Sequence, residues 1–177
     1  MLDFGGIAKG YAAEKCAKLL EAAGIEAALL SLGGNVQTVG TKPDGSAWAV
    51  GIADPENPTQ AIATLTFTGS LALVTSGGYQ RYFEEDGVRY HHILDPKTGY
   101  PARSGLASVT ILAESGTLAD ALSTALFVMG LDAGAALYRA GDLAFEAVFM
   151  TDDGSVWITP GLVGQYQSDR PYQVLQP

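Results

Sequence analysis

Residues 27–67 read AALLSLGGNVQTVGTKPDGSAWAVGIADPENPTQAIATLTF, and this stretch decides the fold class. Short apolar runs that are typical of strands follow one another in it, and no helical pattern lies between them. The runs occupy residues 27–32, 36–39, 48–53 and 61–67. Glycine-rich and polar turn sequences separate them. Strands that follow one another in this way favour an α+β fold over a doubly wound parallel sheet.

Strands and helices continue on both sides of this stretch. The same criteria predict strands at residues 71–75, 88–94, 107–112, 145–151 and 156–158. Helical periodicity predicts helices at residues 8–23, 118–129 and 133–139, with Gly24 and Gly130 placed to end the first two. We see no linker and no internal repeat. Residues 1–177 should therefore form one α+β domain, with helices packed on a mixed or antiparallel sheet.

The composition limits the classes of function. Of the 177 residues, 47% are hydrophobic, which suits one domain with a sizeable core. The formal net charge is −9, and an acidic chain gains nothing from counterion release at phosphates, so we expect no nucleic-acid partner. An acidic protein that binds a phosphorylated ligand usually needs a cation to offset the repulsion between like charges. The charge is thus a first hint of a metal.

Cys16 is the only cysteine, so the chain has no intrachain disulfide. It lies among Ala13, Ala17 and Leu20 in the first helical pattern, where we expect an inert, packed thiol. No apolar run is long enough to span a bilayer, and these residues contain no signal peptide. Because the sequence opens directly inside a motif at Asp3, we expect that upstream sequence is missing.

The N-terminal motif DFGGIAKG, residues 3–10, places glycines directly before a helix. Backbone N–H groups at such a helix start can approach an anion, and the helix dipole favours negative charge there. Lys9 could add a point charge for phosphate, and Asp3 could accept hydrogen bonds from a ribose or a base. The alternative is an ordinary helix entry with a capping carboxylate and a solvated lysine. The spacing matches neither a Walker loop nor a dinucleotide fingerprint.

Both histidines of the chain stand together in HHILDPKTG, residues 91–99. Adjacent side chains of a strand face opposite ways, so His91 and His92 cannot serve one site equally. One of them could act as an acid or base, because the ordinary pKa of histidine lies near neutrality. The alternative is a strand end followed by an Asp-Pro turn.

The segment DALST, residues 120–124, carries a possible metal site. Asp120 and Thr124 are four residues apart, so a helix places them on one face, one turn apart. A carboxylate and a hydroxyl are hard oxygen ligands that suit Mg²⁺ and do not suit zinc. The alternative is a carboxylate favoured by the helix dipole and a threonine that bonds back to a carbonyl.

Smaller features stay open between a ligand and a structural role. GGN at residues 33–35 and TSGG at residues 75–78 interrupt apolar runs, and they could let the backbone approach a ligand or simply form turns. The aromatic residues Tyr79, Tyr82 and Phe83 could pack in the core or present a ring to a planar ligand. We expect at least two of the three in the core.

The order of these motifs resembles the ApbE flavin transferases, which once carried the label of thiamine biosynthesis lipoproteins. The resemblance rests on five segments: DFGGIAKGYA at 3–12, GGN at 33–35, TSGGYQRY at 75–82, HHILDPKTGYP at 91–101 and ADALSTA at 119–125. It implies Mg²⁺-dependent attack on the FAD pyrophosphate, transfer of FMN to a Thr or Ser hydroxyl of a partner protein, and release of AMP. Some members look like FAD pyrophosphatases, with water as the acceptor.

The resemblance also implies roles for particular residues. Asp120 and Thr124 resemble the side-chain metal ligands of the family, and Gly6 and Ser123 fall where it supplies backbone carbonyls to the metal. Flavin-nucleotide contacts fall at Asp3 and Lys9, and His92 and Leu94 fall in a segment that lines the same pocket. His92 and Asp120 are therefore the expected catalytic residues, with His92 as the base that activates the acceptor hydroxyl.

Departures from the family pattern are expected to matter to different degrees. Family members carry an upstream part with aromatic and polar contacts to the flavin and adenine, and this chain should represent their C-terminal portion. Glu14 stands where an aspartate is usual, which we expect to be harmless. The family also implies an extracytoplasmic, membrane-anchored location, and an acceptor flavoprotein of a membrane electron-transport complex. A non-catalytic flavin-binding domain is the alternative.

Overall fold

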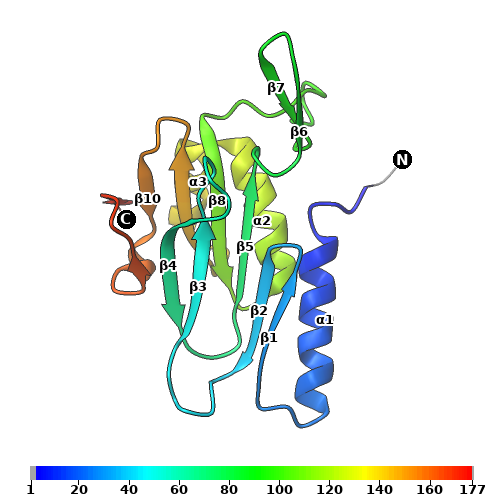
Figure 1. The fold of residues 1–177 in the computed structure, drawn as a ribbon, viewed down its shortest axis with the longest axis vertical. Helices are drawn as coiled ribbons and strands as arrows, with labels where there is room; N and C mark the ends of the chain where they lie inside the picture. Colours follow the sequence, from blue (N-terminus) through cyan, green and yellow to red (C-terminus); the bar gives the residue numbers. More distant parts are fainter. Residues whose placement is uncertain (1–2, 177) are drawn as a thin grey trace.

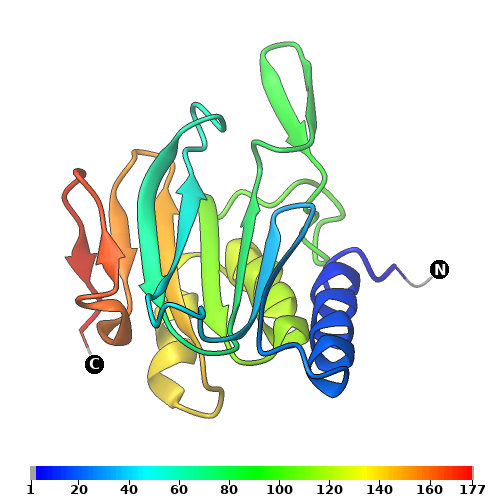
Figure 2. The ribbon, with the colours of Figure 1, turned by 60° about the horizontal axis from the view of Figure 1, so that its bottom comes forward.

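The computed structural model describes residues 3–176, which form three layers around one central sheet (Figures 1 and 2). Helices cover one face of this sheet, and a smaller sheet covers the other. In chain order the elements are α1 (Ala8–Ala22), β1 (Ala27–Leu32), β2 (Asn35–Gly40), β3 (Trp48–Ala53), β4 (Ala61–Phe67), β5 (Ala72–Gly77), β6 (Tyr82–Glu85), β7 (Val88–His91), β8 (Leu106–Ala113), α2 (Gly116–Met129), α3 (Leu131–Ala140), β9 (Glu146–Thr151), β10 (Val156–Ile158), the 3-10 helix η1 (Pro160–Leu162), β11 (Tyr166–Gln167) and β12 (Gln173–Val174).

The central sheet has seven strands in the order β1-β2-β5-β8-β9-β10-β12. Its neighbouring strands are antiparallel except β10 and β12, which are parallel. The smaller sheet has the order β11-β4-β3, and β6 and β7 form a separate hairpin. The expected α+β class with a mixed sheet is therefore confirmed.

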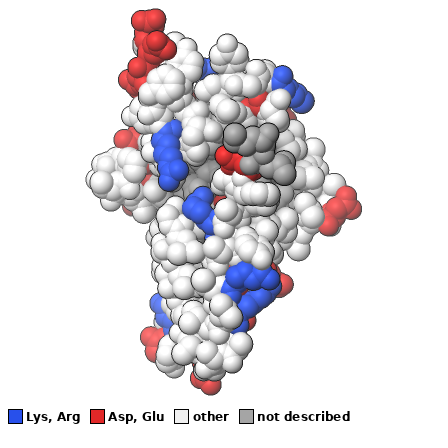
Figure 3. All heavy atoms as spheres, turned by 90° about the vertical axis from the view of Figure 1, so that its right-hand side faces the viewer, with Lys and Arg blue, Asp and Glu red and all other residues white. Residues whose placement is uncertain are grey.

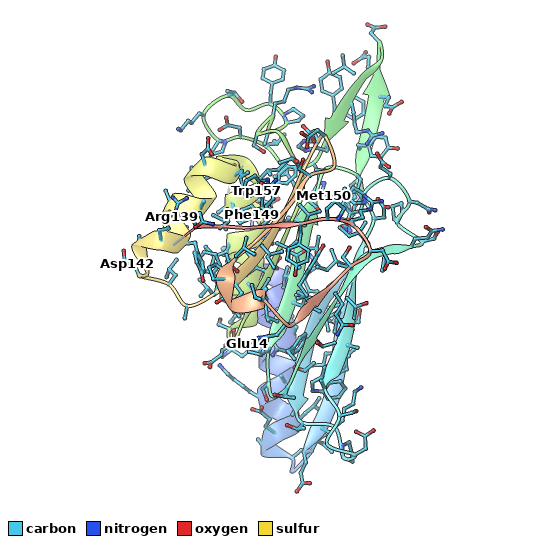
Figure 4. All side chains as sticks on the ribbon, turned by 90° about the vertical axis from the view of Figure 1, so that its left-hand side faces the viewer. Glu14, Arg139, Asp142, Phe149, Met150 and Trp157 are labelled. Atoms are coloured by element: carbon cyan, nitrogen blue, oxygen red, sulfur yellow. The ribbon has the colours of Figure 1, made fainter. Side chains whose placement is uncertain are left out.

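Two hydrophobic cores lie on the two faces of the central sheet, because side chains of a strand alternate between faces. Neighbouring residues of β9 illustrate this (Figure 4): Phe149 packs in the helical core and Met150 packs in the core against the smaller sheet. Gly134 allows α3 to approach β9 closely, since a Cβ there would lie 2.9 Å from a ring carbon of Phe149. The glycine that weakens the helical pattern of α3 is thus required by packing.

The predicted boundaries hold well where local signals mark them. β3 and β4 coincide with the predicted strands, and the predicted helices correspond to α1, α2 and α3. Gly24 and Gly130 have positive φ angles of 81° and 84° and follow the ends of their helices, as expected. The predicted strand at 88–94 is too long, because β7 ends at His91 and only an isolated bridge joins Leu94 to Pro101.

Some predicted burial is wrong. Cys16 is exposed, since α1 packs through its small residues Gly10, Ala13 and Ala17 and turns its larger apolar side chains outward. Of Tyr79, Tyr82 and Phe83, only Tyr79 is buried. Tyr82 and Phe83 lie on the hairpin, which stands away from both cores (Figure 2), so the expectation that two of the three pack in the core fails.

Within residues 3–176, no helix is both long enough and apolar enough to cross a membrane.

Candidate active site

The N-terminal turns of α1 meet the middle of α2, and this joins two motifs that are far apart in sequence. The backbone N–H of Gly10 donates a hydrogen bond of 2.8 Å to Oδ2 of Asp120, and the ammonium of Lys9 lies 3.9 Å from Oδ1 of the same carboxylate. Asp120 is only 2% exposed. A buried carboxylate with one backbone donor and a distant lysine keeps unused capacity to accept further positive charge.

Glycines make this approach of the two helices possible. A Cβ on Gly10 would lie 2.6 Å from the Cβ of Asp120 and would overlap the carbonyl oxygen of Gly116. A Cβ on Gly116 would in turn lie 2.8 Å from the carbonyl oxygen of Gly10. The backbones of α1 and α2 are therefore in direct contact next to Asp120, and no other residue type fits at either glycine without moving a helix.

Hydrogen bonds to Glu14 also join α1 to the start of α2. Its Oε2 accepts hydrogen bonds from the hydroxyl of Ser115 and from both the backbone N–H and the hydroxyl of Thr117, at the start of α2. Its Oε1 accepts a hydrogen bond of 2.6 Å from Lys18. The bond from Lys18 and those from Thr117 and Ser115 outweigh the opposing effect of burial and lower the pKa of Glu14 to about 2. Glu14 is thus ionised under ordinary conditions and holds α1 to α2.

Three hydroxyl groups gather one turn along α2 from Asp120. The hydroxyl oxygens of Ser76 and Ser123 are 2.8 Å apart, and that of Ser76 is 3.1 Å from that of Thr124. The hydroxyl of Ser123 donates to the carbonyl oxygen of Asp120. Gly6 also approaches this group, since a Cβ on it would lie 3.5 Å from the Thr124 hydroxyl oxygen. The structure therefore brings Gly6, Ser123 and Thr124 close to one another, one helical turn along α2 from Asp120.

The GGN motif reaches the same region from the turn between β1 and β2. Gly33 and Gly34 have φ angles of 59° and 92°, which suit a two-residue hairpin turn. A Cβ on Gly33 would lie 3.6 Å from the side chain of Lys9. Asn35 is buried, and its Nδ2 has no hydrogen-bond partner among residues 3–176. An unsatisfied buried amide of this kind often marks a position that a ligand or water completes.

The two histidines face opposite ways, as their adjacency predicts. The Nε2 of His91 lies 3.0 Å from the carbonyl oxygen of Ala102, and its ring packs edge-on against Phe127. Burial lowers the pKa of His91 below its ordinary value. His92 is exposed, and its Nδ1 lies 3.2 Å from the carbonyl oxygen of Arg81. Packing is therefore the role of His91, and His92 is the histidine that remains accessible.

The alternation continues past the end of β7. Ile93 is 6% exposed and packs in the helical core, whereas Leu94 is 53% exposed. His92 and Leu94 thus share the outer side of the segment, although the strand ends before them. Within the described chain the carboxylate of Asp3 accepts from Gly5, and His92 lies against the carbonyl of Arg81, so neither residue is hydrogen-bonded to Asp120.

The donor set fits a hard cation. Residues 3–176 contain no group of three or more His, Cys, Asp and Glu side chains that could hold a metal. A cation at Asp120 must therefore rely on one carboxylate, on hydroxyl and carbonyl oxygens, and on water. Mg²⁺ is bound in this way, through few carboxylates and with several waters retained, and zinc is not.

Comparison with known proteins places these features in a family. The sequence pattern of the ApbE family matches residues 1–149. The chain belongs to the ApbE family. Its sequence is 43% identical over 170 residues to an FAD:protein FMN transferase of Treponema pallidum, a match that covers 92% of this chain and 47% of that protein. An FAD:protein FMN transferase of Klebsiella pneumoniae is 40% identical over 176 residues, covering 98% of this chain and 53% of the relative.

Solved ApbE structures share the fold. An ApbE protein from Thermotoga maritima aligns with a TM-score of 0.84 at 40% sequence identity, over 93% of this chain and 53% of that one. The apo form of the flavinyl transferase ApbE from Pseudomonas stutzeri aligns with a TM-score of 0.74 at 37% identity, over 93% and 51% of the two chains. This ApbE chain spans about half the length of the curated relatives it matches.

Two features of this ApbE site were missed from sequence. In the sequence Ser76 stands out only as part of a glycine-rich interruption, but it lies within β5 and contacts both Ser123 and Thr124. Glu14 stood out in the sequence only as a glutamate at a position where an aspartate is usual, and its four hydrogen bonds, three to Ser115 and Thr117 and one to Lys18, appear only in the structure. The spacing of Glu14 and Lys18 indicates only an ion pair within α1. It does not indicate the hydrogen bonds from Glu14 to Ser115 and Thr117 at the start of α2.

Proposed function

We propose that this chain takes part in Mg²⁺-dependent transfer of FMN from FAD to a Thr or Ser hydroxyl of an acceptor protein, with release of AMP. The observation that carries the proposal is the buried carboxylate of Asp120, which accepts from the backbone N–H of Gly10, lies 3.9 Å from the ammonium of Lys9 and stands four residues before Thr124 on α2. The names of the relatives, FAD:protein FMN transferase, support the same reaction. The site residues required for it belong to three segments of this chain, residues 3–10, 91–99 and 120–124.

In the proposed reaction, the acceptor oxygen attacks the phosphorus on the riboflavin side of the FAD pyrophosphate. A new P–O bond to the acceptor forms, the P–O bond to AMP breaks, and AMP leaves with the bridging oxygen. Asp120 and Thr124, with the backbone carbonyls of Gly6 and Ser123, would hold Mg²⁺, which neutralises charge on the phosphate oxygens and orients the leaving group.

The remaining steps belong to protein groups. The N-terminus of α1 and the ammonium of Lys9 attract the negative pyrophosphate. Asp3 is placed before this helix to accept hydrogen bonds from the nucleotide. His92 takes the proton of the acceptor hydroxyl, and Leu94, on the same side of the segment, contacts the flavin. These roles rest on the family resemblance and on the exposure of His92 and Leu94.

The partner and location follow from the resemblance alone. We propose an acceptor flavoprotein of a membrane electron-transport complex, and an extracytoplasmic place of action with membrane anchoring in the natural protein.

The test combines ligand binding with turnover. Calorimetry in Mg²⁺ should give tighter binding of FAD than of FMN, because Lys9 and the cation contact the pyrophosphate and the AMP side. Turnover should yield AMP together with flavin bound to an acceptor protein. Release of free FMN without labelled acceptor would indicate FAD hydrolysis instead. Flavin binding without AMP release would indicate a non-catalytic domain, and equal affinity for FAD and FMN would contradict a pyrophosphate site.

A further inference from the structure

Ser76 brings a hydroxyl group from the central sheet to the helix α2. It lies on β5, whose residues Ala72 and Val74 pack in the helical core, while Leu73 packs in the core against the smaller sheet. Because the side chains of a strand alternate between its two faces, Ser76 faces α2, and Thr75 faces the smaller sheet. The two neighbouring hydroxyl groups of β5 therefore serve opposite sides of the sheet.

The hydrogen bonds around Ser76 have one consistent direction, because each hydroxyl group carries a single proton. The carbonyl oxygen of Asp120 can only accept, so Ser123 gives its proton to this carbonyl over 2.9 Å. The contact of 2.8 Å between the hydroxyl oxygens of Ser123 and Ser76 then uses the proton of Ser76. The contact of 3.1 Å between Ser76 and Thr124 in turn uses the proton of Thr124. We call this series, from Thr124 through Ser76 and Ser123 to the carbonyl of Asp120, the hydroxyl chain.

The direction of the hydroxyl chain decides what the oxygen of Thr124 can do. A hydroxyl group binds a cation through a lone pair of its oxygen, so its proton must point away from the cation. In the hydroxyl chain the proton of Thr124 points to Ser76. Both lone pairs of the Thr124 oxygen stay out of this bond, and they are therefore available to a ligand.

Burial fixes the inner end of the hydroxyl chain. Ser123 and Asp120 are 0% and 2% exposed, whereas Ser76 and Thr124 are half-buried. Lysine and arginine side chains are spread over the surface on the α1 side of the molecule (Figure 3), but the hydroxyl group of Ser123 lies below the surface. A buried hydroxyl group that loses its partner is costly, so Ser123 holds its proton on the carbonyl of Asp120. The hydrogen bonds transmit this orientation outward to Thr124, which a ligand can reach.

We propose that Ser76 is a positioning residue for the Mg²⁺ site: it accepts the proton of Thr124 and thereby presents a lone pair of that hydroxyl to the cation. This inference rests on the proposed function, which places Mg²⁺ at Asp120 and Thr124. Ser76 acts through Thr124 and is not itself a ligand, because its own proton is given to Ser123. Groups that orient metal ligands in this way typically change metal affinity by about 10–100-fold when they are removed.

The affinity for Mg²⁺ measures this role without the reaction. Ser76→Ala removes the acceptor and leaves the hydroxyl group of Thr124 free to turn its proton toward the cation. We expect the Kd for Mg²⁺, measured by calorimetry with and without FAD, to rise about ten-fold in this variant. Ser76→Thr keeps a hydroxyl group and should stay within about three-fold of the unaltered protein. An unchanged Kd in Ser76→Ala, or an equal loss in both variants, would overturn the proposal.

A double-mutant cycle shows whether Ser76 acts through Thr124. Thr124→Val keeps the shape of the side chain and removes its hydroxyl group, so it should weaken Mg²⁺ binding by itself. In that background Ser76→Ala has no hydroxyl group left to orient, and it should change the Kd for Mg²⁺ by less than about two-fold. If Ser76→Ala weakened Mg²⁺ binding equally in both backgrounds, its effect would not pass through Thr124, and the proposal would be wrong.

Thr75→Val is the matched control on the same strand. The hydroxyl oxygens of Thr75 and Thr110 are 2.8 Å apart, so this variant also loses a hydrogen bond between two hydroxyl groups, on the opposite face of the sheet. Without metal, the melting temperature should fall in both Thr75→Val and Ser76→Ala. The Kd for Mg²⁺ should rise only in Ser76→Ala, and an equal rise in Thr75→Val would assign the effect to stability and overturn the proposal.

The unaltered protein separates failure of this inference from failure of the proposed function. If it binds no Mg²⁺, either alone or with FAD, the metal site at Asp120 is wrong, and the role of Ser76 is wrong with it. If it binds Mg²⁺ with the same affinity as Ser76→Ala, only the role of Ser76 is wrong, and the proposed function is unaffected.

Discussion

The backbone N–H of Gly10 donates to Oδ2 of Asp120 over 2.8 Å, although 110 residues separate the two in sequence. This bond joins the start of α1 to the carboxylate that the candidate metal site depends on. It also sets the distance between the two helices, because neither Gly10 nor Gly116 leaves room for a side chain at their contact. The site is therefore only as well formed as the contact between α1 and α2.

Replacement of Gly10 by alanine should damage both stability and the site. The new methyl group would overlap Gly116 and approach Asp120 to 2.6 Å, so α1 must move away from α2. We expect a loss of about 1–3 kcal/mol in the free energy of unfolding, measured by urea denaturation. Gly51→Ala is the control, because a Cβ there meets only the methyl of Ala61 at 3.3 Å. Equal stability of the two variants would contradict the tight contact.

Asp120→Asn should abolish Mg²⁺ binding while the fold remains intact. Asparagine keeps an oxygen that accepts from Gly10, but it removes the one charged ligand of the proposed site. Mg²⁺ should raise the melting temperature of the unaltered protein and not that of the variant, and AMP release should fall close to background. Asp132→Asn, at an exposed position on α3, should respond to Mg²⁺ like the unaltered protein. If Mg²⁺ raised the melting temperature of Asp120→Asn as much as that of the unaltered protein, the metal assignment would be wrong.

His92→Ala should lower the maximal rate much more than His91→Ala. His92 is exposed on the outer side of its segment, whereas His91 is held against Phe127 and its pKa is lowered by burial. A general base typically contributes about 10²–10⁴-fold to a rate. Kinetics at saturating FAD measure this effect. If His92→Ala raised the KM for FAD and left kcat unchanged, His92 would serve in binding, and another group would take the proton of the acceptor hydroxyl.

Glu14 should make stability depend on pH in the acidic range. Its pKa is about 2 in the folded protein, against an ordinary value of 4.5. The unfolded chain binds the proton more tightly, so this stabilisation is complete above pH 4.5 and disappears as pH falls through about 2. At neutral pH, Glu14→Gln should cost about 1–2 kcal/mol, because the carboxylate is partly exposed to solvent. Urea denaturation from pH 7 to pH 2 should show the stability difference between Glu14→Gln and the unaltered protein shrinking, and a difference that stays constant would contradict the lowered pKa.

Local patterns in the sequence predict most of the fold. Alternation identifies β3, where Trp48, Val50 and Ile52 are buried, and glycines identify the ends of α1 and α2. These signals act over a few residues, so they can be read without knowing what packs against the element. The order of strands in the central sheet depends on pairings between distant residues, and periodicity holds no information about it.

The burial of a side chain and its hydrogen-bond partners are harder to predict, because both depend on which other element packs against it. Cys16 lies on the outward face of a helix that packs through alanine and glycine, and Phe83 lies on a ribbon outside both cores. For the same reason Ser76 and Glu14 carry no local mark of their contacts with α2. Helical spacing predicts that Asp120 and Thr124 lie on one face of α2, whereas only the family resemblance links Gly6 to them.

The alternation from Val88 to Leu94 constrains how this family can vary in length here. A single residue inserted or deleted between the turn at Asp86 and His92 would exchange the two sides of the segment, turning His92 inward and Ile93 outward unless a bulge absorbed the change. Insertions of whole cross-strand pairs would lengthen the ribbon and leave every downstream side chain on its present side. A change of two residues, one added to each strand, should therefore keep His92 outward and Ile93 inward in this chain, and a change of one residue within β7 should not.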